Sequence, residues 1–153
     1  MNIISDDIIH FFQKQNFTIV STIDAKGMPH SSCKGIVKIN RAGKVYLIDL
    51  YKENTYKNLK RNPEISVTAV DEHRFKGYCL KGIAQIIERD KFGSALLKAW
   101  EKKISGRITK RILKNISGEI GHLEHPEARF PKPAYLIAVK VKEAVNLTPR
   151  HLK

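Results

Sequence analysis

The residues best suited to chemistry gather between Lys52 and Lys57, where the sequence reads K-E-N-T-Y-K. The ammonium of Lys52, the amide of Asn54 and the hydroxyl of Thr55 are donor types that bind phosphate groups. If a helix begins here, its free N–H groups and the positive end of its dipole would add to such an anion site. Thr and Asn are also common capping residues, so an ordinary helix start is the alternative interpretation.

A second candidate site contains His122 and His125, which are three residues apart and have Glu124 and Glu127 beside them. Two histidines at this spacing can share a metal ion when a helix aligns them. Pro126 predicts a loop instead, so a polar loop is the favoured interpretation and no metal ligands are assigned.

The two cysteines, Cys33 and Cys79, lack the C-x-x-C spacing of a metal or redox motif. Two thiols alone cannot complete a structural zinc site, and we expect both to be reduced rather than joined in a disulfide. Cysteine most often serves as a small buried residue, so we expect Cys33 to be buried and Cys79 to pack in the core. A redox role for Cys33 is the alternative.

Six segments rich in apolar and β-branched residues predict the strands that would position these groups. They span residues 17–23, 29–39, 45–50, 65–70, 77–88 and 134–145. Asp24 to Gly27 (D-A-K-G) is a hairpin signal in which Gly27 can adopt positive φ, and Arg41 to Gly43 forms another turn. Strands joined in this way predict an antiparallel barrel in a mainly β (α+β) fold.

Three or so helices would lie around this barrel. Ser5 can cap a helix over residues 5–14, whose apolar stripe would face the core. Asn62-Pro63 would end a short helix over residues 52–61. The remaining predicted elements are a helix over residues 90–103, a broken helix over 104–116 that is interrupted at Gly106, and a loop over 118–133.

The chain of 153 residues reads as a single domain over residues 1–153, without an internal repeat or a linker. Alternating βαβ units and a G-x-G-x-x-G turn are both absent from the sequence, which argues against the usual dinucleotide-binding fold. Acidic residues occur near the start of the sequence, which argues against a secretory signal peptide. No segment approaches the roughly 18 to 20 apolar residues that span a bilayer. We therefore expect a cytoplasmic protein without a transmembrane segment.

The formal net charge of +13 favours an anionic partner, which could be nucleic acid, acidic lipid or a phosphorylated small molecule. A basic run from Lys98 to Lys114 flanks an apolar stripe. A solvated helix face is the plainest interpretation of this run. A surface for nucleic acid or anionic lipid is the alternative, although the run lacks the interleaved aromatics of single-strand binders.

The order of several short motifs resembles one known family. The first motif is G-M-P-H (27–30), which is followed by a strand to Lys38 and then by G-K-V-Y-L (43–47). K-E-N-T-Y-K-N-L-K-R-N-P (52–63) then precedes E-I-S-V, and G-Y-C-L-K-G-I-A-Q-I-I (77–87) comes next. Over roughly residues 8–100 the chain is similar to the pyridoxamine 5′-phosphate oxidase-like, FMN-binding split-barrel proteins, in which K-G-x-A marks a barrel bend.

The resemblance implies a split β-barrel that works as a homodimer and holds FMN non-covalently at the subunit interface. It also implies an oxidoreductase that passes hydride or electrons between a donor and a small-molecule substrate, with no residue assigned as catalytic. By position, the flavin ring and ribityl chain would lie along the strand residues Ser32, Cys33, Lys34 and Gly35. The facing strand would end with Asp49, Leu50 and Tyr51. The phosphate would be bound by Lys52, Asn54 and Thr55, with Lys57 nearby.

Departures from the family pattern narrow this expectation. The larger oxidases have an arginine-lysine pair where this chain has Asn54 and Thr55, and the chain lacks their long C-terminal extension, so we do not expect vitamin B6 oxidation. Residues 104–133 match no family segment and are expected to be a divergent helical and loop insertion.

The basic run could also form a wall over the flavin that attracts an acidic substrate. The alternative function is a non-enzymatic binding module for haem, a deazaflavin, or nucleic acid or an anionic surface through residues 98–114.

Overall fold

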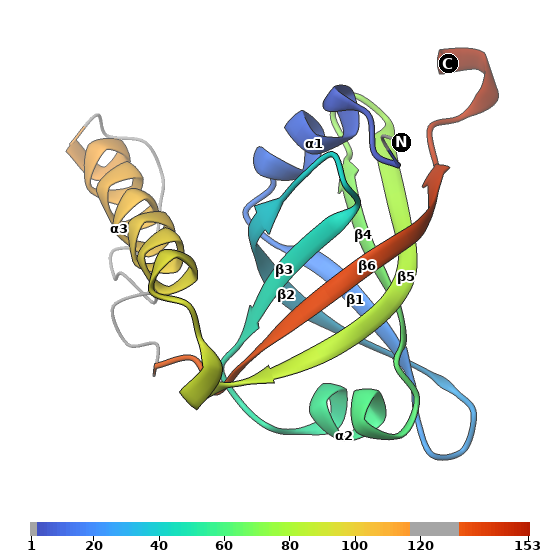
Figure 1. The fold of residues 1–153 in the computed structure, drawn as a ribbon. Coiled ribbons are helices and arrows are strands. Elements are labelled where there is room, and N and C mark those ends of the chain that lie inside the picture. Colours follow the sequence, from blue (N-terminus) through green and yellow to red (C-terminus); the bar gives the residue numbers. More distant parts are fainter. Residues whose placement is uncertain (1–2, 117–131) are drawn as a thin grey trace.

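Six antiparallel strands close into a barrel in the computed structural model, which describes residues 3–116 and 132–153 (Figure 1). The strands are β1 (Thr18–Ile23), β2 (Pro29–Ile39), β3 (Lys44–Asp49), β4 (Glu64–Asp71), β5 (Lys76–Glu88) and β6 (Tyr135–Asn146). Around the barrel they follow the order β1-β2-β3-β6-β5-β4, so that β6 closes the ring between β3 and β5. The predicted six-stranded, mainly β barrel is confirmed.

Turns with the predicted residues connect the first strands. The Asp24 carboxylate accepts hydrogen bonds from the backbone N–H groups of Lys26 (2.8 Å) and Met28 (2.9 Å). Gly27 and Gly43 have φ values of +79° and +78°, a conformation that costs most other residues roughly 1–2 kcal/mol. These two turns set β1 against β2 and β2 against β3.

A β-bulge bends the long strand β5 around the barrel. The pairing of β5 with β6 shifts register between Lys81 and Gly82. A Cβ atom at Gly82 would collide with the carbonyl oxygen of Lys140 on β6, so glycine is needed for this close backbone approach. The K-G-x-A segment therefore marks a bend, as predicted.

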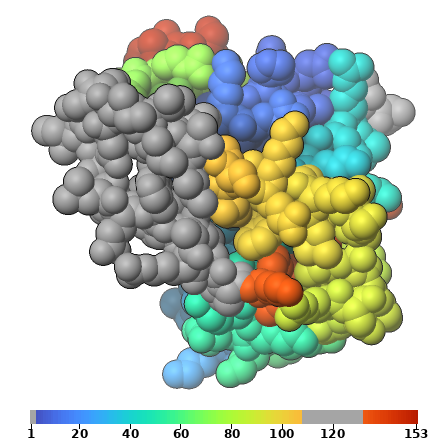
Figure 2. All heavy atoms as spheres, turned by 90° about the vertical axis from the view of Figure 1, so that its left-hand side faces the viewer, coloured from blue at the N-terminus to red at the C-terminus, as the bar shows by residue number. Residues whose placement is uncertain are grey.

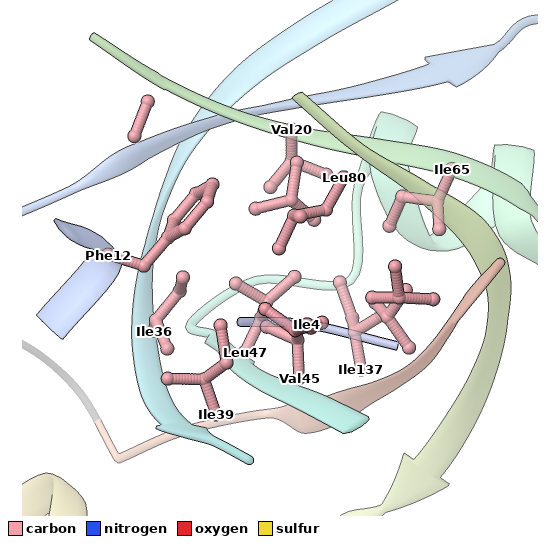
Figure 3. Close-up of a cluster of buried hydrophobic side chains, with 14 of the residues drawn as sticks. Ile4, Phe12, Val20, Ile36, Ile39, Val45, Leu47, Ile65, Leu80 and Ile137 are labelled. Carbon is pink, nitrogen blue, oxygen red and sulfur yellow. The ribbon is translucent and has the colours of Figure 1, made fainter. Parts of the chain in front are cut away.

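Apolar side chains from all around the barrel fill its interior (Figure 3). Val20, Val45, Leu47 and Leu80 are fully buried there, and each such side chain stabilises the fold by about 1.5–3 kcal/mol. Phe12 enters the same cluster from helix α1 (Asp6–Gln13). Because packed side chains occupy the interior, a ligand of any size must bind on the outside of the barrel.

Three α-helices lie outside the strands in the described part of the chain. In Figure 1, α1 and α2 (Asn54–Arg61) lie at opposite ends of the barrel, and α3 (Ser94–Ile116) stands beside it, in contact with β2. Two 3-10 helices, η1 (Arg89–Lys91) and η3 (Arg150–Leu152), are also present. The end of α2 at Arg61 confirms the predicted stop at Asn62-Pro63.

The helix predictions need three corrections. α3 begins at Ser94 rather than Asp90, which leaves Phe92 outside the helix. It also continues through Gly106 without a break, because glycine costs a helix interior only about 1 kcal/mol relative to alanine. Ser5 occupies the N-cap of α1, but its hydroxyl makes no capping hydrogen bond.

Neither cysteine is buried in the core, contrary to the prediction. Cys33 is exposed, Cys79 is half-buried, and both thiols are free. Cys33 lies directly opposite Ile19 on β1, and Cys79 lies opposite Thr68 on β4. Opposite residues share one face of a sheet, and Ile19 is itself 45% exposed, so Cys33 lies on the outer face of the barrel.

Candidate functional site

A cleft of about 410 Å³ lies on the outside of the barrel, between α3 and the strands β2 and β3. We call it the α3 cleft, and Figure 2 shows α3 lying over this side of the molecule. It is lined by Cys33, Lys34 and Gly35 of β2 and by Asp49, Leu50 and Tyr51 at the end of β3. The cleft thus brings together six residues that the sequence had marked as candidates for ligand binding.

A buried ion pair belongs to this lining. Lys34 Nζ is 2.8 Å from Asp49 Oδ2, and the two side chains are only 10% and 11% exposed. They meet because β2 and β3 are antiparallel, with Gly35 opposite Ile48 one position further along. The pair holds the Lys34 ammonium in one place beside the cleft, where a solvated lysine would be mobile.

Tyr135, the first residue of β6, completes the polar cluster. Its hydroxyl donates a 2.6 Å hydrogen bond to Asp49 Oδ2, and the Leu50 N–H donates a 2.9 Å bond to Asp49 Oδ1. Burial, and then the hydrogen bond to the Asp49 carboxylate, raises the pKa of Tyr135 far above its usual value. The phenol therefore stays protonated and keeps Asp49 in position as the counter-ion of Lys34.

Helix α3 supplies the opposite wall of the cleft through Trp100, Lys103 and Arg107. Residues three and four positions apart share one face of a helix, so these three side chains point the same way. A Cβ atom at Gly35 would lie 3.9 Å from Arg107 Nη2, which shows that the guanidinium reaches β2. The wall therefore approaches the strands closely.

Lys103 of this wall has an unusual environment for a lysine. Its ammonium donates a hydrogen bond to the backbone carbonyl of Ile36. Burial, and then the nearby charge of Arg107, lowers the pKa of Lys103 to about 8. Lys103 is still mostly protonated near neutral pH, so it contributes a positive charge to the cleft.

The charge of the α3 cleft is positive over its described lining. Lys34, Lys103 and Arg107 are the cations there, and Asp49 is the carboxylate. Because Lys34 already neutralises Asp49, the positive charge comes from the α3 wall. Such a cleft favours a ligand that carries negative charge.

The α3 cleft leads along β2 toward the first turn of α2. Ser32 Oγ and Thr55 Oγ1 share a 3.1 Å hydrogen bond, and Thr55 is only 4% exposed. Residues 32 to 35 of an extended strand span about 10 Å. The start of α2, where a helix presents free N–H groups, is therefore connected to the cleft by one short stretch of β2.

The other predicted phosphate ligands lie around the start of α2 and are not part of the described cleft lining. Lys52 Nζ is 2.6 Å from Glu88 Oε2, and the Tyr56 hydroxyl donates a 2.7 Å hydrogen bond to Glu88 Oε1. The bond to Glu88 raises the pKa of Lys52, and the same bond lowers the pKa of Glu88. Asn54 and Lys57 are exposed. Lys52 is thus paired with a carboxylate that no sequence pattern had linked to it.

Sequence reasoning missed part of this site. Tyr135 was read only as part of a strand. Lys103 and Arg107 belong to the basic run, for which a wall over the flavin was one of several interpretations. The spacing of Trp100, Lys103 and Arg107 was the one available signal that they share a face. His122 and His125, with nearly all of the predicted loop over 118–133, lie outside the described residues.

No group of three His, Cys, Asp or Glu side chains in residues 3–116 and 132–153 is arranged to hold a metal ion. None of the helices in those ranges combines the length and apolar character of a membrane span.

The chain is similar to one protein family and to several proteins of known structure. The family model described as pyridoxamine 5′-phosphate oxidase matches residues 4–144. Among solved structures, HupZ of Group A Streptococcus is 20% identical with a TM-score of 0.65, and the match covers 95% of this chain and 94% of that chain. A Clostridium acetobutylicum protein related to general stress protein 26, of the pyridoxinephosphate oxidase family, is 16% identical with a TM-score of 0.60, covering 98% and 93%.

A structure of an F420 reductase is 13% identical with a TM-score of 0.61, and the match covers 93% of this chain and 98% of that chain. A search of curated proteins found no match. Structural similarity at these sequence identities shows a shared fold, and proteins that share a fold can bind different ligands.

Proposed function

The chain belongs to the pyridoxamine 5′-phosphate oxidase family, and on this premise we propose that it is an FMN-binding oxidoreductase other than a vitamin B6 oxidase. The flavin ring and ribityl chain would lie in the α3 cleft along Cys33 to Gly35, with the phosphate at the start of α2. Bound FMN would supply the exchange of hydride or electrons with a small-molecule substrate. The chain's own residues would hold and orient the flavin and set the charge around it.

The observation that carries this proposal is the charged α3 cleft itself. Cofactor sites are concave and mostly apolar, with a few fixed polar groups, and the α3 cleft has this character. A reduced flavin ring carries negative charge that nearby donors stabilise. Lys34, fixed by Asp49, is a suitable donor on β2, and Trp100 offers an apolar surface on the opposite wall.

The hydrogen bond between Ser32 and Thr55 supports the proposed phosphate end. It joins the strand that lines the cleft to the first turn of an eight-residue helix. Free N–H groups at a helix start bind phosphate together with the helix dipole. Lys52 would contribute by exchanging the Glu88 carboxylate for the phosphate, since both are anions that an ammonium can bind.

We include a homodimer with FMN at its interface in this proposal. Phe17 and Tyr51 line the α3 cleft and yet are 60% and 57% exposed. Large aromatic side chains at the rim of a cleft are suited to being covered by a ligand or a second subunit. Light scattering with and without FMN measures the subunit number, and a monomer under both conditions would overturn this part.

The absorbance spectrum of freshly purified protein tests the proposed function. We expect yellow protein with flavin bands, and release of FMN on denaturation, identified by its mass. Colourless protein that shows no measurable affinity for added FMN would reject the proposal.

A deazaflavin is the alternative ligand, and an F420 reductase is one of the proteins that have this fold. The mass of the released compound separates this alternative from FMN. A haem would be identified in the same way. Nucleic acid would instead bind with an affinity that falls steeply as salt rises, whereas FMN affinity would fall only modestly.

A further inference from the structure

A second hollow adjoins the α3 cleft on the far side of Lys103 and Arg107. It has a volume of about 760 Å³ and lies between the end of α1, strand β2 and helix α3. Figure 2 shows α1 and α3 next to each other on this side of the molecule. The two hollows share Ile36, Val37, Lys103 and Arg107 in their linings, so they meet at the α3 wall. We call the second hollow the basic cleft.

The basic cleft is lined by cations from three elements. Lys14 follows α1, Lys38 lies on β2 and Lys102 on α3, and Lys103 and Arg107 face it as well as the α3 cleft. Its described lining contains no aspartate or glutamate. Lys14, Lys38 and Lys102 are exposed, and none of them forms an ion pair with a described carboxylate. Such a concentration of like charge attracts an anion.

Amide side chains add neutral hydrogen-bond donors to these cations. Gln13, Gln15 and Asn16 belong to the same described lining, and no aromatic residue does. Single-stranded nucleic acids are held by cations together with aromatic side chains on which the bases stack. The basic cleft therefore fits a small phosphate or carboxylate group better than a nucleic acid strand.

The half-buried ammonium of Lys103 gives independent support. Its burial and the charge of Arg107 disfavour its protonated form, as the lowering of its pKa to about 8 shows. An anion bound beside both residues would offset this penalty by its opposite charge. The α3 wall is thus arranged to gain stability from an anionic ligand.

We propose that the basic cleft binds the anionic group of the redox substrate, so that the substrate is a small molecule bearing a phosphate or carboxylate whose reacting part enters the α3 cleft. This proposal rests on the proposed function for its redox role. Binding of an anion to the basic cleft is, however, measurable whether or not flavin is bound.

The test compares two triple variants with the same change in net charge. Lys14→Gln/Lys38→Gln/Lys102→Gln removes the exposed cations of the basic cleft. Lys26→Gln/Lys44→Gln/Lys140→Gln removes three lysines that also lie on exposed positions but are outside the cleft lining. Calorimetric titration of the FMN-loaded proteins with inorganic pyrophosphate and with succinate, at constant ionic strength, measures the Kd of each class of anion.

We expect the cleft variant to raise the Kd for at least one anion by roughly tenfold and the control to change it less than about twofold. The anion with the lower Kd, pyrophosphate or succinate, identifies the substrate's anionic group as a phosphate or a carboxylate. Equal weakening in both variants would overturn the proposal, because the net charge alone would then explain binding. Melting curves of both variants check that the fold is intact.

A short single-stranded oligonucleotide serves as the competing ligand. If it binds the unmodified protein more tightly than either small anion, with a steep dependence on salt that the cleft variant abolishes, the cleft is a nucleic acid site and the proposal is wrong. If the protein takes up no FMN, the proposed function fails, and the same titrations of the flavin-free protein still decide whether the basic cleft binds anions.

Discussion

Lys34 and Asp49 lie side by side on β2 and β3, with the ammonium 2.8 Å from the carboxylate and both side chains about nine-tenths buried. Tyr135 and the Leu50 N–H complete the carboxylate's hydrogen bonds. A buried charge is tolerated only when it is paired and hydrogen-bonded, and this pair satisfies both conditions. It therefore gives the α3 cleft a cation whose position is fixed before any ligand arrives.

The first prediction concerns this pair. We expect Asp49→Asn to destabilise the protein by about 3–5 kcal/mol, because it leaves the Lys34 ammonium buried without a counter-ion. The double variant Lys34→Met/Asp49→Leu should cost much less, since it removes both charges. Urea unfolding of the single and double variants measures the difference, and equal losses in the two would contradict the role assigned to the pair.

The second prediction concerns the phosphate end of the proposed FMN site. We expect Lys52→Ala combined with Thr55→Val to weaken FMN binding by about tenfold or more, because two donors to the phosphate are lost. Lys60→Ala is the control, since Lys60 Nζ also lies near Glu88, at 3.7 Å. Titration of flavin fluorescence gives the Kd values, and an unchanged affinity in the double variant would refute this placement of the phosphate.

The third prediction uses Trp100, the one tryptophan of the chain, which lines the α3 cleft. A flavin in this cleft lies close to the indole and should quench most of the protein's tryptophan emission. The measurement follows this emission while FMN is added to flavin-free protein. If flavin fluorescence reports binding while the Trp100 emission stays constant, the flavin is bound elsewhere.

The fourth prediction concerns pH. Lys103 has a pKa of about 8 in the folded protein and an ordinary value of 10.5. Between these values the unfolded chain binds more protons than the folded one, so this residue makes the free energy of unfolding rise with pH across that window. Lys103→Met should remove the rise.

The check for Lys103 is urea unfolding of both proteins at about pH 7.5 and pH 9.5. The comparison between the two proteins isolates the effect of Lys103, because the other charged residues of the α3 cleft, Lys34, Asp49 and Arg107, are present in both. An identical pH response of the two proteins would show that Lys103 titrates normally.

The fifth prediction compares two glycines. Gly82→Ala should destabilise the barrel by about 1–3 kcal/mol, because its Cβ would collide with the Lys140 carbonyl and force β5 and β6 apart. Gly106→Ala should stabilise α3 by up to about 1 kcal/mol, because its Cβ meets nothing nearby and alanine favours a helix. Thermal melting of both variants tests this prediction, since the melting temperature should fall for Gly82→Ala and rise for Gly106→Ala.

Much of the barrel could be predicted because its signals are local. The D-A-K-G turn, the glycine at position 43 and the Asn62-Pro63 stop each act within a few residues, and the structure has a turn or a helix end at each. The continuity of α3 through Gly106 could not be predicted in the same way. A single glycine has a small local cost, and whether a helix continues past it depends on the rest of the helix.

The candidate site could be predicted residue by residue only on its strand side, and a wall formed by the basic run was one of several interpretations of that run. Cys33 to Gly35 and Asp49 to Tyr51 follow from the order of motifs along neighbouring strands. The α3 wall depends on where the helix packs against the barrel, which is a tertiary property. The Lys52–Glu88 pair joins residues 36 positions apart at the ends of different elements, and no pattern in either segment indicates it.

The place of β6 between β3 and β5 has a consequence for how the chain folds during synthesis. Until residues 135–146 leave the ribosome, the other five strands can form only an open sheet with β3 and β5 as its unpaired edges. From the time β5 emerges until β6 follows, the nascent chain must keep these edges apart from other polypeptides. Ring closure is therefore the final step of folding, and a chain that stops before β6 is a substrate for chaperones and proteases.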